Sequence, residues 1–170
     1  LLRTGILCIH FVRNAAYYRA WNAAPVDRRR EQFWRTLNGN FIDLCMLEWC
    51  KLFGDLKAQH HWSKCVTDTN AFSAGLYDHT GLNKAEFEAY RLEVREYRDK
   101  FVAHLDSEEI MTPPHLDPMW GAVRFYFRHV MTHEMEPAEA AKFRAEMGGG
   151  EITDYFTRCF AEARKVYPRQ

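Results

Sequence analysis

Apolar residues recur at helical spacing along nearly the whole chain. Between residues 5 and 24 the larger apolar side chains are Leu7, Phe11, Tyr18 and Trp21. Their spacing predicts a first helix, and Pro25 is expected to end it. A second run, from about residue 27 to 53, has no proline and becomes almost continuously apolar across FIDLCMLEWCKLF. This continuity predicts a helix buried on most sides, at the centre of a bundle.

The middle of the chain changes character twice. Gly54 and Asp55 interrupt the second run, and the segment up to residue 82 is typical of an irregular crossover with one or two short helices. Asn83, followed three residues later by Glu86, then predicts a capped helix start and a helix to about Leu105. Its apolar seam, with spacings of 3, 4, 3 and 4, consists of Phe87, Tyr90, Val94, Tyr97 and Phe101. The next position in this series is His104.

Three further helices follow. Asp117 is expected to cap one with Pro118 in its first turn, and Pro137 to start a short one that the glycines at 148–150 stop. The last runs from residue 152 and ends before Pro168. Because no segment alternates with a period of two, the prediction is all-α: an up-and-down bundle of four to five main helices, forming one domain over residues 1–170.

The amino-acid composition indicates which cellular compartment and which classes of partner to expect. Lys plus Arg equals Asp plus Glu at 23 each, so no net field draws the chain to nucleic acid or to a membrane. The five cysteines include no C-x-x-C pair, which favours a reducing, cytoplasmic location over a disulfide framework. The apolar opening GILCIHFV is shorter than the ~20 residues that cross a bilayer, and no signal-peptide pattern accompanies it, so no membrane association is expected.

The stretch YRDKFVAHLD concentrates the candidate chemistry in Arg98, Asp99 and His104. Six positions place Arg98 and His104 about 120° apart on an ideal helix, so they do not share one face. The length of the arginine side chain, a bend near the helix end, or a second copy across a two-fold axis could bring them together. Without one of these, Arg98 and Asp99 are surface charges and His104 is a packed histidine near a helix end.

This stretch resembles the HEPN superfamily, whose hallmark is an arginine, often a polar residue after it, and a histidine after a short spacer. EYRDKFVAHLD is especially similar to the abortive-infection branch, over about residues 86–106. The resemblance implies a metal-independent endoribonuclease without a cofactor, of a bacterial toxin or phage-defence type. It further implies RNA as substrate, a homodimer with facing motifs, and a possible antitoxin protein.

The chemistry that the resemblance implies suits these side chains. A neutral His104 would take the proton of a ribose 2′-hydroxyl, and Arg98 would stabilise charge on the phosphate, giving a cyclic phosphate end. Asp99 would orient one of the two. The alternative is a noncatalytic HEPN-like helical module that binds nucleotide, RNA or a protein partner.

Neighbouring residues could extend an RNA-binding surface. Arg91, Arg95 and Arg98 are spaced 4 and 3, so they form a basic stripe that could follow a phosphate backbone. Tyr97 could stack on a base, although its place in the seam favours core packing.

Two other positions invite chemistry. His129 and His133 could share a metal, but the zincin motif has Glu directly after its first histidine and Val130 stands there instead. This difference favours a solvent-facing pair of histidines without a metal. Glu48, inside an apolar helix, requires a partner and is either a structural pair or a site residue.

Overall fold

The computed structural model describes residues 1–24, 32–103 and 112–167. Over these ranges it contains no strand and eight α-helices: α1 (Leu2–Asn22), α2 (Gln32–Trp49), α3 (Trp62–Cys65), α4 (Thr69–Thr80), α5 (Lys84–Tyr97), α6 (Leu116–His129), α7 (Pro137–Glu146) and α8 (Ile152–Val166). Three helices continue into π-helical turns: η1 (Cys50–Gly54) after α2, η2 (Arg98–Ala103) after α5 and η3 (Val130–Glu134) after α6. The all-α prediction is confirmed, and five helices have 14 or more residues.

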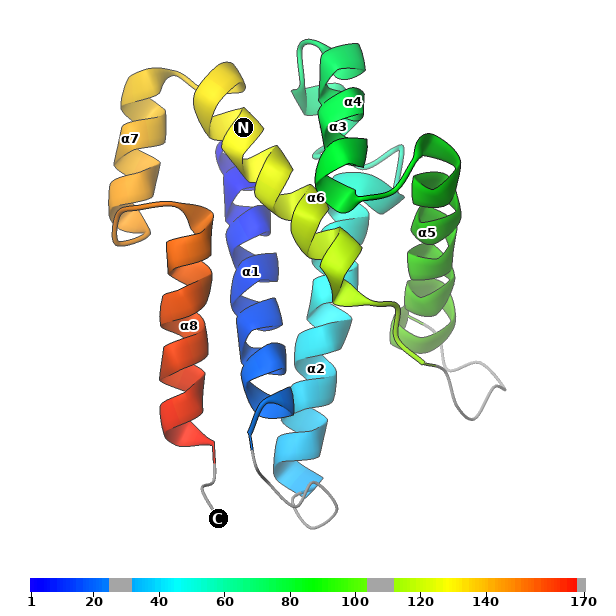
Figure 1. Ribbon diagram of the computed structural model, residues 1–170, viewed down its shortest axis with the longest axis vertical. Coiled ribbons are helices and arrows are strands. Elements are labelled where there is room, and N and C mark those ends of the chain that lie inside the picture. The colour runs from blue at the N-terminus through cyan, green and yellow to red at the C-terminus, as the bar shows by residue number, and fades with distance from the viewer. Residues whose placement is uncertain (25–31, 104–111, 168–170) are drawn as a thin grey trace.

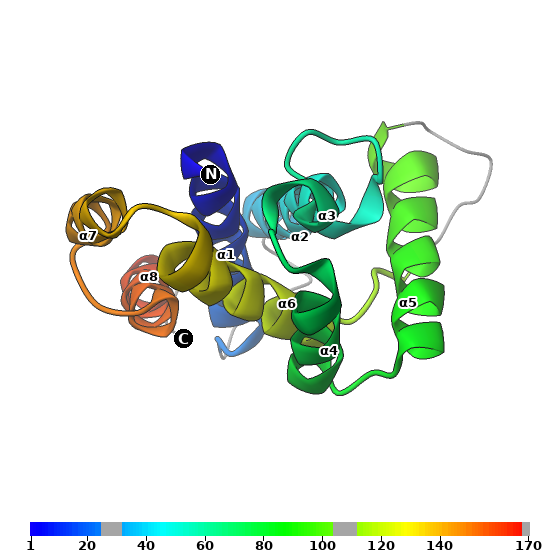
Figure 2. The ribbon, with the colours of Figure 1, turned by 90° about the horizontal axis from the view of Figure 1, so that it is seen from above.

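The centre of the bundle is α1. It lies between α8 and α2, with α6 crossing it and α5 on the far side of α2 (Figures 1 and 2). Ala15, Ala16 and Ala20 are at most 1% exposed, because small side chains let neighbouring helices approach closely. The prediction that the second helix is the centre was therefore wrong: the buried residues of α2 all lie from Ile42 onward, Leu44 in that stretch is still 39% exposed, and Phe33 near the start of the helix is 69% exposed. No helix within the described ranges is both long and apolar enough to cross a membrane.

Aromatic rings join α2, α5, α4 and α6 into the main core. Trp49 stacks on Phe53 at 5.2 Å between ring centroids and meets the edge of Tyr90 at 5.8 Å. Phe53 contacts Tyr126 at 5.5 Å, and Tyr126 contacts Phe72 at 5.3 Å. These edge-on and stacked pairs connect helices that are far apart in the sequence.

The predicted start and seam of α5 are confirmed. The Asn83 side chain accepts from the Glu86 backbone N–H at 3.0 Å, and the Glu86 carboxylate accepts from the Asn83 N–H at 2.8 Å. Four seam residues are at most 9% exposed: Phe87, Tyr90, Val94 and Tyr97. The seam opens at Phe101, which is 37% exposed. The predicted continuation through His104 to Leu105 lies outside the described residues.

The start of α6 differs from the prediction. His115 occupies the cap position, so Asp117 and Pro118 both lie in the first turn. Asp117 instead pairs with Arg19 of α1, while Leu116 is drawn into the core at 7% exposure. Burial of this leucine moves the helix start two residues earlier than the capping preference of Asp117 indicated.

The crossover, for which one or two short helices were predicted, holds two helices: α3, with four residues, and α4, which is longer than expected at 12 residues. The Asp68 carboxylate accepts from the N–H groups of Asn70 and Ala71 at its start, and Gly81 ends it in the left-handed region. At Gly121 of α6, a Cβ atom would lie 2.3 Å from the His79 carbonyl oxygen. Glycine is thus required there for α4 and α6 to cross.

The C-terminal elements follow the sequence closely. Pro137 begins α7, which ends at Glu146, and the glycines at 148, 149 and 150 have φ values of 89°, 75° and 80°. These left-handed conformations stop α7 and reverse the chain into α8.

All five cysteines lie in the described part of the chain, and none forms a disulfide. Cys8, Cys45, Cys50 and Cys159 are buried, and burial raises the pKa of each thiol, that of Cys50 to about 12. Cys65 alone is only partly covered.

Candidate functional site

Arg98 is the first residue of the π-helical turn η2, directly after the end of α5. Its Nε donates to Asp99 at 2.7 Å, and its Nη1 donates to Asp55 at 2.5 Å. Nη2 also lies 2.7 Å from Asp99, and the arginine side chain is 16% exposed. Burial of the guanidinium by itself lowers the pKa of Arg98. The hydrogen bond to Asp55 and nearby negative groups raise this pKa by more, so the net shift is upward and the side chain stays charged.

Asp55 comes from a different part of the chain, just after η1. Gly54 eases close packing of η1 against α5, because a Cβ there would lie 3.0 Å from the Cys50 sulfur and 3.3 Å from Cγ of Arg95, tighter than ordinary contacts. The second arginine reaches the same carboxylate, with Nε of Arg95 3.6 Å from Asp55. We call Asp55, Arg95, Arg98 and Asp99 the Arg98 corner.

The three arginines of the predicted stripe converge on this segment. Arg91 donates to the Gly54 carbonyl at 3.0 Å and pairs with Glu88 at 2.8 Å, with 11% of its side chain exposed. The Nε atom of Arg95 is buried and has no hydrogen-bond partner. The stripe therefore faces the loop after η1 and is only partly open to solvent.

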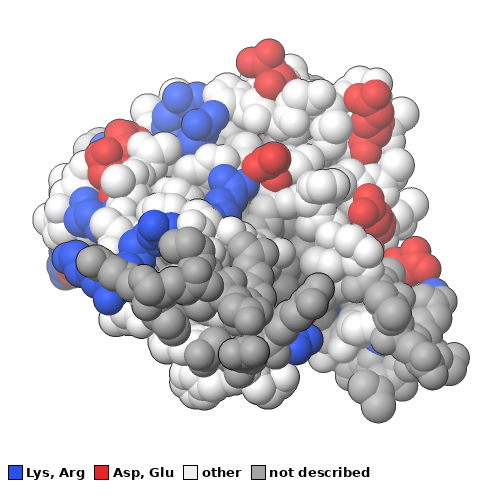
Figure 3. All heavy atoms as spheres, turned by 60° about the horizontal axis from the view of Figure 1, so that its bottom comes forward, with Lys and Arg blue, Asp and Glu red and all other residues white. Residues whose placement is uncertain are grey.

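The outward face of α5 is acidic. Five carboxylates on α5 and the start of η2 are exposed: Glu86, Glu88, Glu93, Glu96 and Asp99. Acidic side chains line the right-hand edge in Figure 3, on the side where α5 lies in Figure 1. A phosphate backbone that reached the arginines would have to avoid this face.

Tyr97 lies in the core, as its place in the seam indicates. It is 5% exposed, and its ring stacks on Phe101 with centroids 5.8 Å apart. Its hydroxyl donates to Asp43 of α2 at 2.9 Å, and burial together with this bond raises the pKa of the phenol. These contacts favour the packing role over base stacking.

His104 lies outside the described residues, so the structure gives no geometry for the pair Arg98 and His104. The described part of η2 ends at Ala103, the residue before His104. Asp99, the predicted supporting residue, binds Arg98 directly and is 51% exposed at its side chain. The sequence did not point to Asp55, because an acidic residue directly after a glycine is typical of an ordinary turn.

An open hollow of about 620 Å³ adjoins the Arg98 corner. It is lined by Asp55, Leu56, Lys57, Ala58 and Arg95. Leu56, which is 60% exposed, and Ala58 are its apolar members, and the other three lining residues are charged. The hollow offers an approach for a ligand with an anionic group and an apolar part.

A second polar cluster lies where α6 passes into η3. Nε2 of His129 is 3.0 Å from Glu134, five residues on, and its ring is 4.9 Å from that of His133. Glu134 also accepts from the Thr67 backbone N–H at 3.0 Å and from its hydroxyl at 2.7 Å. Within the described ranges, no three His, Cys, Asp or Glu side chains gather so as to hold a metal ion.

Glu48 of α2 is paired with Lys51, in the turn η1 that continues its helix, and lies near His10 of α1. It is 8% exposed, its Oε2 lies 3.1 Å from Nζ of Lys51, and its Oε1 lies 3.9 Å from Nδ1 of His10. The contacts are those of a structural pair, one of the two roles considered from the sequence.

Comparison with known proteins adds no relative: no family model, curated protein or solved structure matches the chain. The resemblance to HEPN proteins therefore rests on the motif at the end of α5.

Proposed function

We propose that the end of α5 is a metal-independent RNA-cleaving site of HEPN type, with Arg98 and His104 as its catalytic residues. The observation that supports this proposal is the way Arg98 is held. Carboxylates from two segments, Asp55 and Asp99, fix its guanidinium at the turn that leads to His104. A charged group fixed before substrate arrives loses little entropy when it binds a phosphate.

Arg98 retains the capacity to bind substrate. A guanidinium carries five N–H groups. Among the described residues, three are directed at Asp55 and Asp99, which leaves two for phosphate oxygens. Asp55 and Asp99 act as positioning residues, since a carboxylate beside a phosphate would be repelled.

The reaction would proceed by attack within the RNA. His104 accepts the proton of the 2′-hydroxyl, the 2′-oxygen bonds to its own phosphorus, and the bond to the 5′-oxygen breaks. The leaving oxygen takes a proton, and the products are a 2′,3′-cyclic phosphate and a 5′-hydroxyl. Arg98 stabilises the charge that builds on the phosphate oxygens. The proposal includes a cytoplasmic homodimer with facing motifs and a possible antitoxin protein.

The test is cleavage of mixed cellular RNA in EDTA by wild type, His104→Ala, Arg98→Ala and the control Lys84→Ala. Lys84 is exposed at the start of α5, away from η2, so its variant should cleave as wild type does. Each of the other two should lower the rate by at least about 100-fold. Thermal unfolding checks that all variants fold, and full cleavage by purified, folded His104→Ala would rule the proposal out.

A noncatalytic module that binds nucleotide, RNA or a protein partner is the second candidate. It is favoured by the contacts of Arg91, Arg95 and Arg98 with the chain's own Gly54 and Asp55, and by the acidic outer face of α5. Wild type that binds RNA or nucleotide but leaves RNA intact would select this candidate.

A further inference from the structure

A hollow of about 250 Å³ opens at the end of the bundle opposite α4. Its floor is α1, and its walls are α2 and α8, which flank α1 in Figure 1. The α2 wall is one helical face, since its lining positions 34, 37 and 41 are spaced 3 and 4. The hollow shares no residue with the Arg98 corner.

Four aromatic rings line this hollow. Tyr17 contacts Phe41 at 5.2 Å between centroids, and Trp34 meets Tyr167 edge-on at 5.3 Å with 76° between their planes. The rings therefore come from α1, from α2 and from the residue that follows α8.

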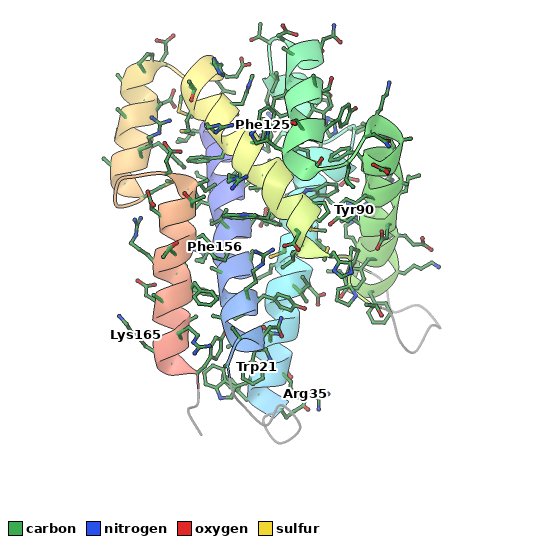
Figure 4. All side chains as sticks on the ribbon, viewed as in Figure 1. Trp21, Arg35, Tyr90, Phe125, Phe156 and Lys165 are labelled. Carbon is green, nitrogen blue, oxygen red and sulfur yellow. The ribbon has the colours of Figure 1, made fainter. Side chains whose placement is uncertain are left out.

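The rings are held from behind. The Tyr167 hydroxyl donates to the Tyr17 carbonyl at 2.9 Å, which ties the end of α8 to α1. Trp21, at the base of α1 in Figure 4, packs on Tyr167 at 5.5 Å and on Trp34 at 6.4 Å. The walls are thus set before any ligand enters.

One charged side chain, Glu162 of α8, is among the described residues that line the hollow. It is exposed, and no ion-pair partner for it is found within the described ranges. It lies close enough to Tyr17 to help raise the pKa of that phenol, although burial contributes more. Burial likewise raises the pKa of Tyr167 to about 12, so both phenols are neutral near pH 7.

We propose that this hollow binds an alkylated ammonium group, such as a quaternary ammonium ion, between its four rings and Glu162. The electron-rich faces of Trp and Tyr attract a cation whose charge is spread over methyl groups, and a nearby carboxylate adds to that attraction. Methyl groups also suit the apolar walls, Leu37 and Val166 among them. An anion would be repelled by Glu162, and a compact primary ammonium ion would lose more hydration on entry.

The experiment compares choline with 3,3-dimethylbutan-1-ol, which has the same shape with carbon in place of the charged nitrogen. Each is titrated into the full chain while the indole N–H resonances are followed by NMR, and Trp34→Phe assigns the Trp34 signal. Choline should shift that signal and bind at least about 10-fold more tightly than the neutral alcohol. Equal affinity for both compounds, or no shift with choline into the tens of millimolar, would overturn the proposal.

Variants separate the charge from the rings. Glu162→Gln should weaken choline binding several-fold and leave the neutral alcohol unaffected, whereas Glu139→Gln on the exposed face of α7 should change neither. Trp34→Ala should abolish choline binding. Should this variant unfold, Trp34→Leu, which keeps an apolar side chain, should show the same loss. Unchanged choline affinity in Glu162→Gln would contradict the role given to the carboxylate.

Discussion

The turns that end α5 and α6 are both π-helical, and each joins its helix to a distant loop through a carboxylate. At η3, Glu134 is 7% exposed at its side chain, and its partners are Thr67 and His129. At η2, Asp55 is 32% exposed, and two arginines meet it. The first carboxylate accepts from three donors, whereas at the second the buried Nε of Arg95 contacts Asp55 only as an ion pair at 3.6 Å and has no hydrogen-bond partner.

This difference separates a structural contact from a candidate site. A buried carboxylate whose hydrogen bonds are complete stabilises the fold and has little left to offer a ligand. A cluster in which a cationic N–H group still has no hydrogen-bond partner can bind an anion. We therefore interpret the contact of Glu134 as a clip between η3 and the loop before α4, and the Arg98 corner as the place for chemistry.

The largest expected loss of stability comes from removing the contact of Glu134 with Thr67 and His129. Glu134→Ala removes the acceptor for both donors of Thr67 and should lower the free energy of unfolding by about 2–4 kcal/mol. Urea unfolding followed by far-UV circular dichroism measures it. The control is Glu136→Ala, because Glu136 is exposed and its side chain makes no capping hydrogen bond. Equal stability of the two variants would show that the clip contributes nothing.

Acid should weaken the same clip. Hydrogen bonds from Thr67 and His129 lower the pKa of Glu134, although burial opposes them. A carboxyl group with a lowered folded-state pKa stabilises the fold above its unfolded value and loses this contribution as pH falls through the folded value. The difference in free energy of unfolding between wild type and Glu134→Gln should thus shrink as the pH falls below 4.5, the ordinary pKa of a glutamate. A gap that stays constant from pH 6 to pH 3 would contradict this assignment.

At the Arg98 corner the stability effect should be smaller and the effect on RNA cleavage larger. Asp55→Asn keeps the shape but removes the charge, and should cost about 1 kcal/mol of unfolding free energy because the pair is partly solvated. Asp99→Asn, at a more exposed carboxylate, should cost less. If Asp55 positions Arg98, Asp55→Asn should lower the cleavage rate more than Asp99→Asn; the reverse order would contradict that role.

Salt should give the smallest effect. Raising NaCl from about 0.05 to 1 M shortens the screening length severalfold, so the stability cost of Asp55→Asn should shrink by a few tenths of a kcal/mol. The cost of Glu134→Ala should hardly change, since neutral donors supply most of its bonds. Parallel urea titrations at both salt concentrations measure the difference, and equal salt sensitivity would remove the contrast between the two turns.

Local sequence signals predicted most helix boundaries. Asn83 with Glu86, Pro137 and the three glycines at 148–150 act through short-range geometry, so their effects could be read directly. The seam of α5 likewise predicted burial from Phe87 to Tyr97, although Phe101 at its end is 37% exposed.

Features that depend on tertiary contacts could not be predicted in this way. Asp55 and Glu134 acquire their roles from partners 43 and 67 residues away. The central place of α1 depends on small residues whose burial is decided by neighbours, and Leu116 overrode the capping preference of Asp117. Arg98 and Asp99 were found from the motif, but the direction of the arginine stripe followed only from the position of Gly54.

The uneven exposure of the thiols has a practical consequence. Four cysteines are buried, and Cys65 alone is partly open to solvent. The natural chain should therefore accept a thiol-reactive fluorophore or spin label at one position, without any cysteine being removed. Cys65 lies two residues before Thr67, so such a label would report when the loop before α4 separates from η3.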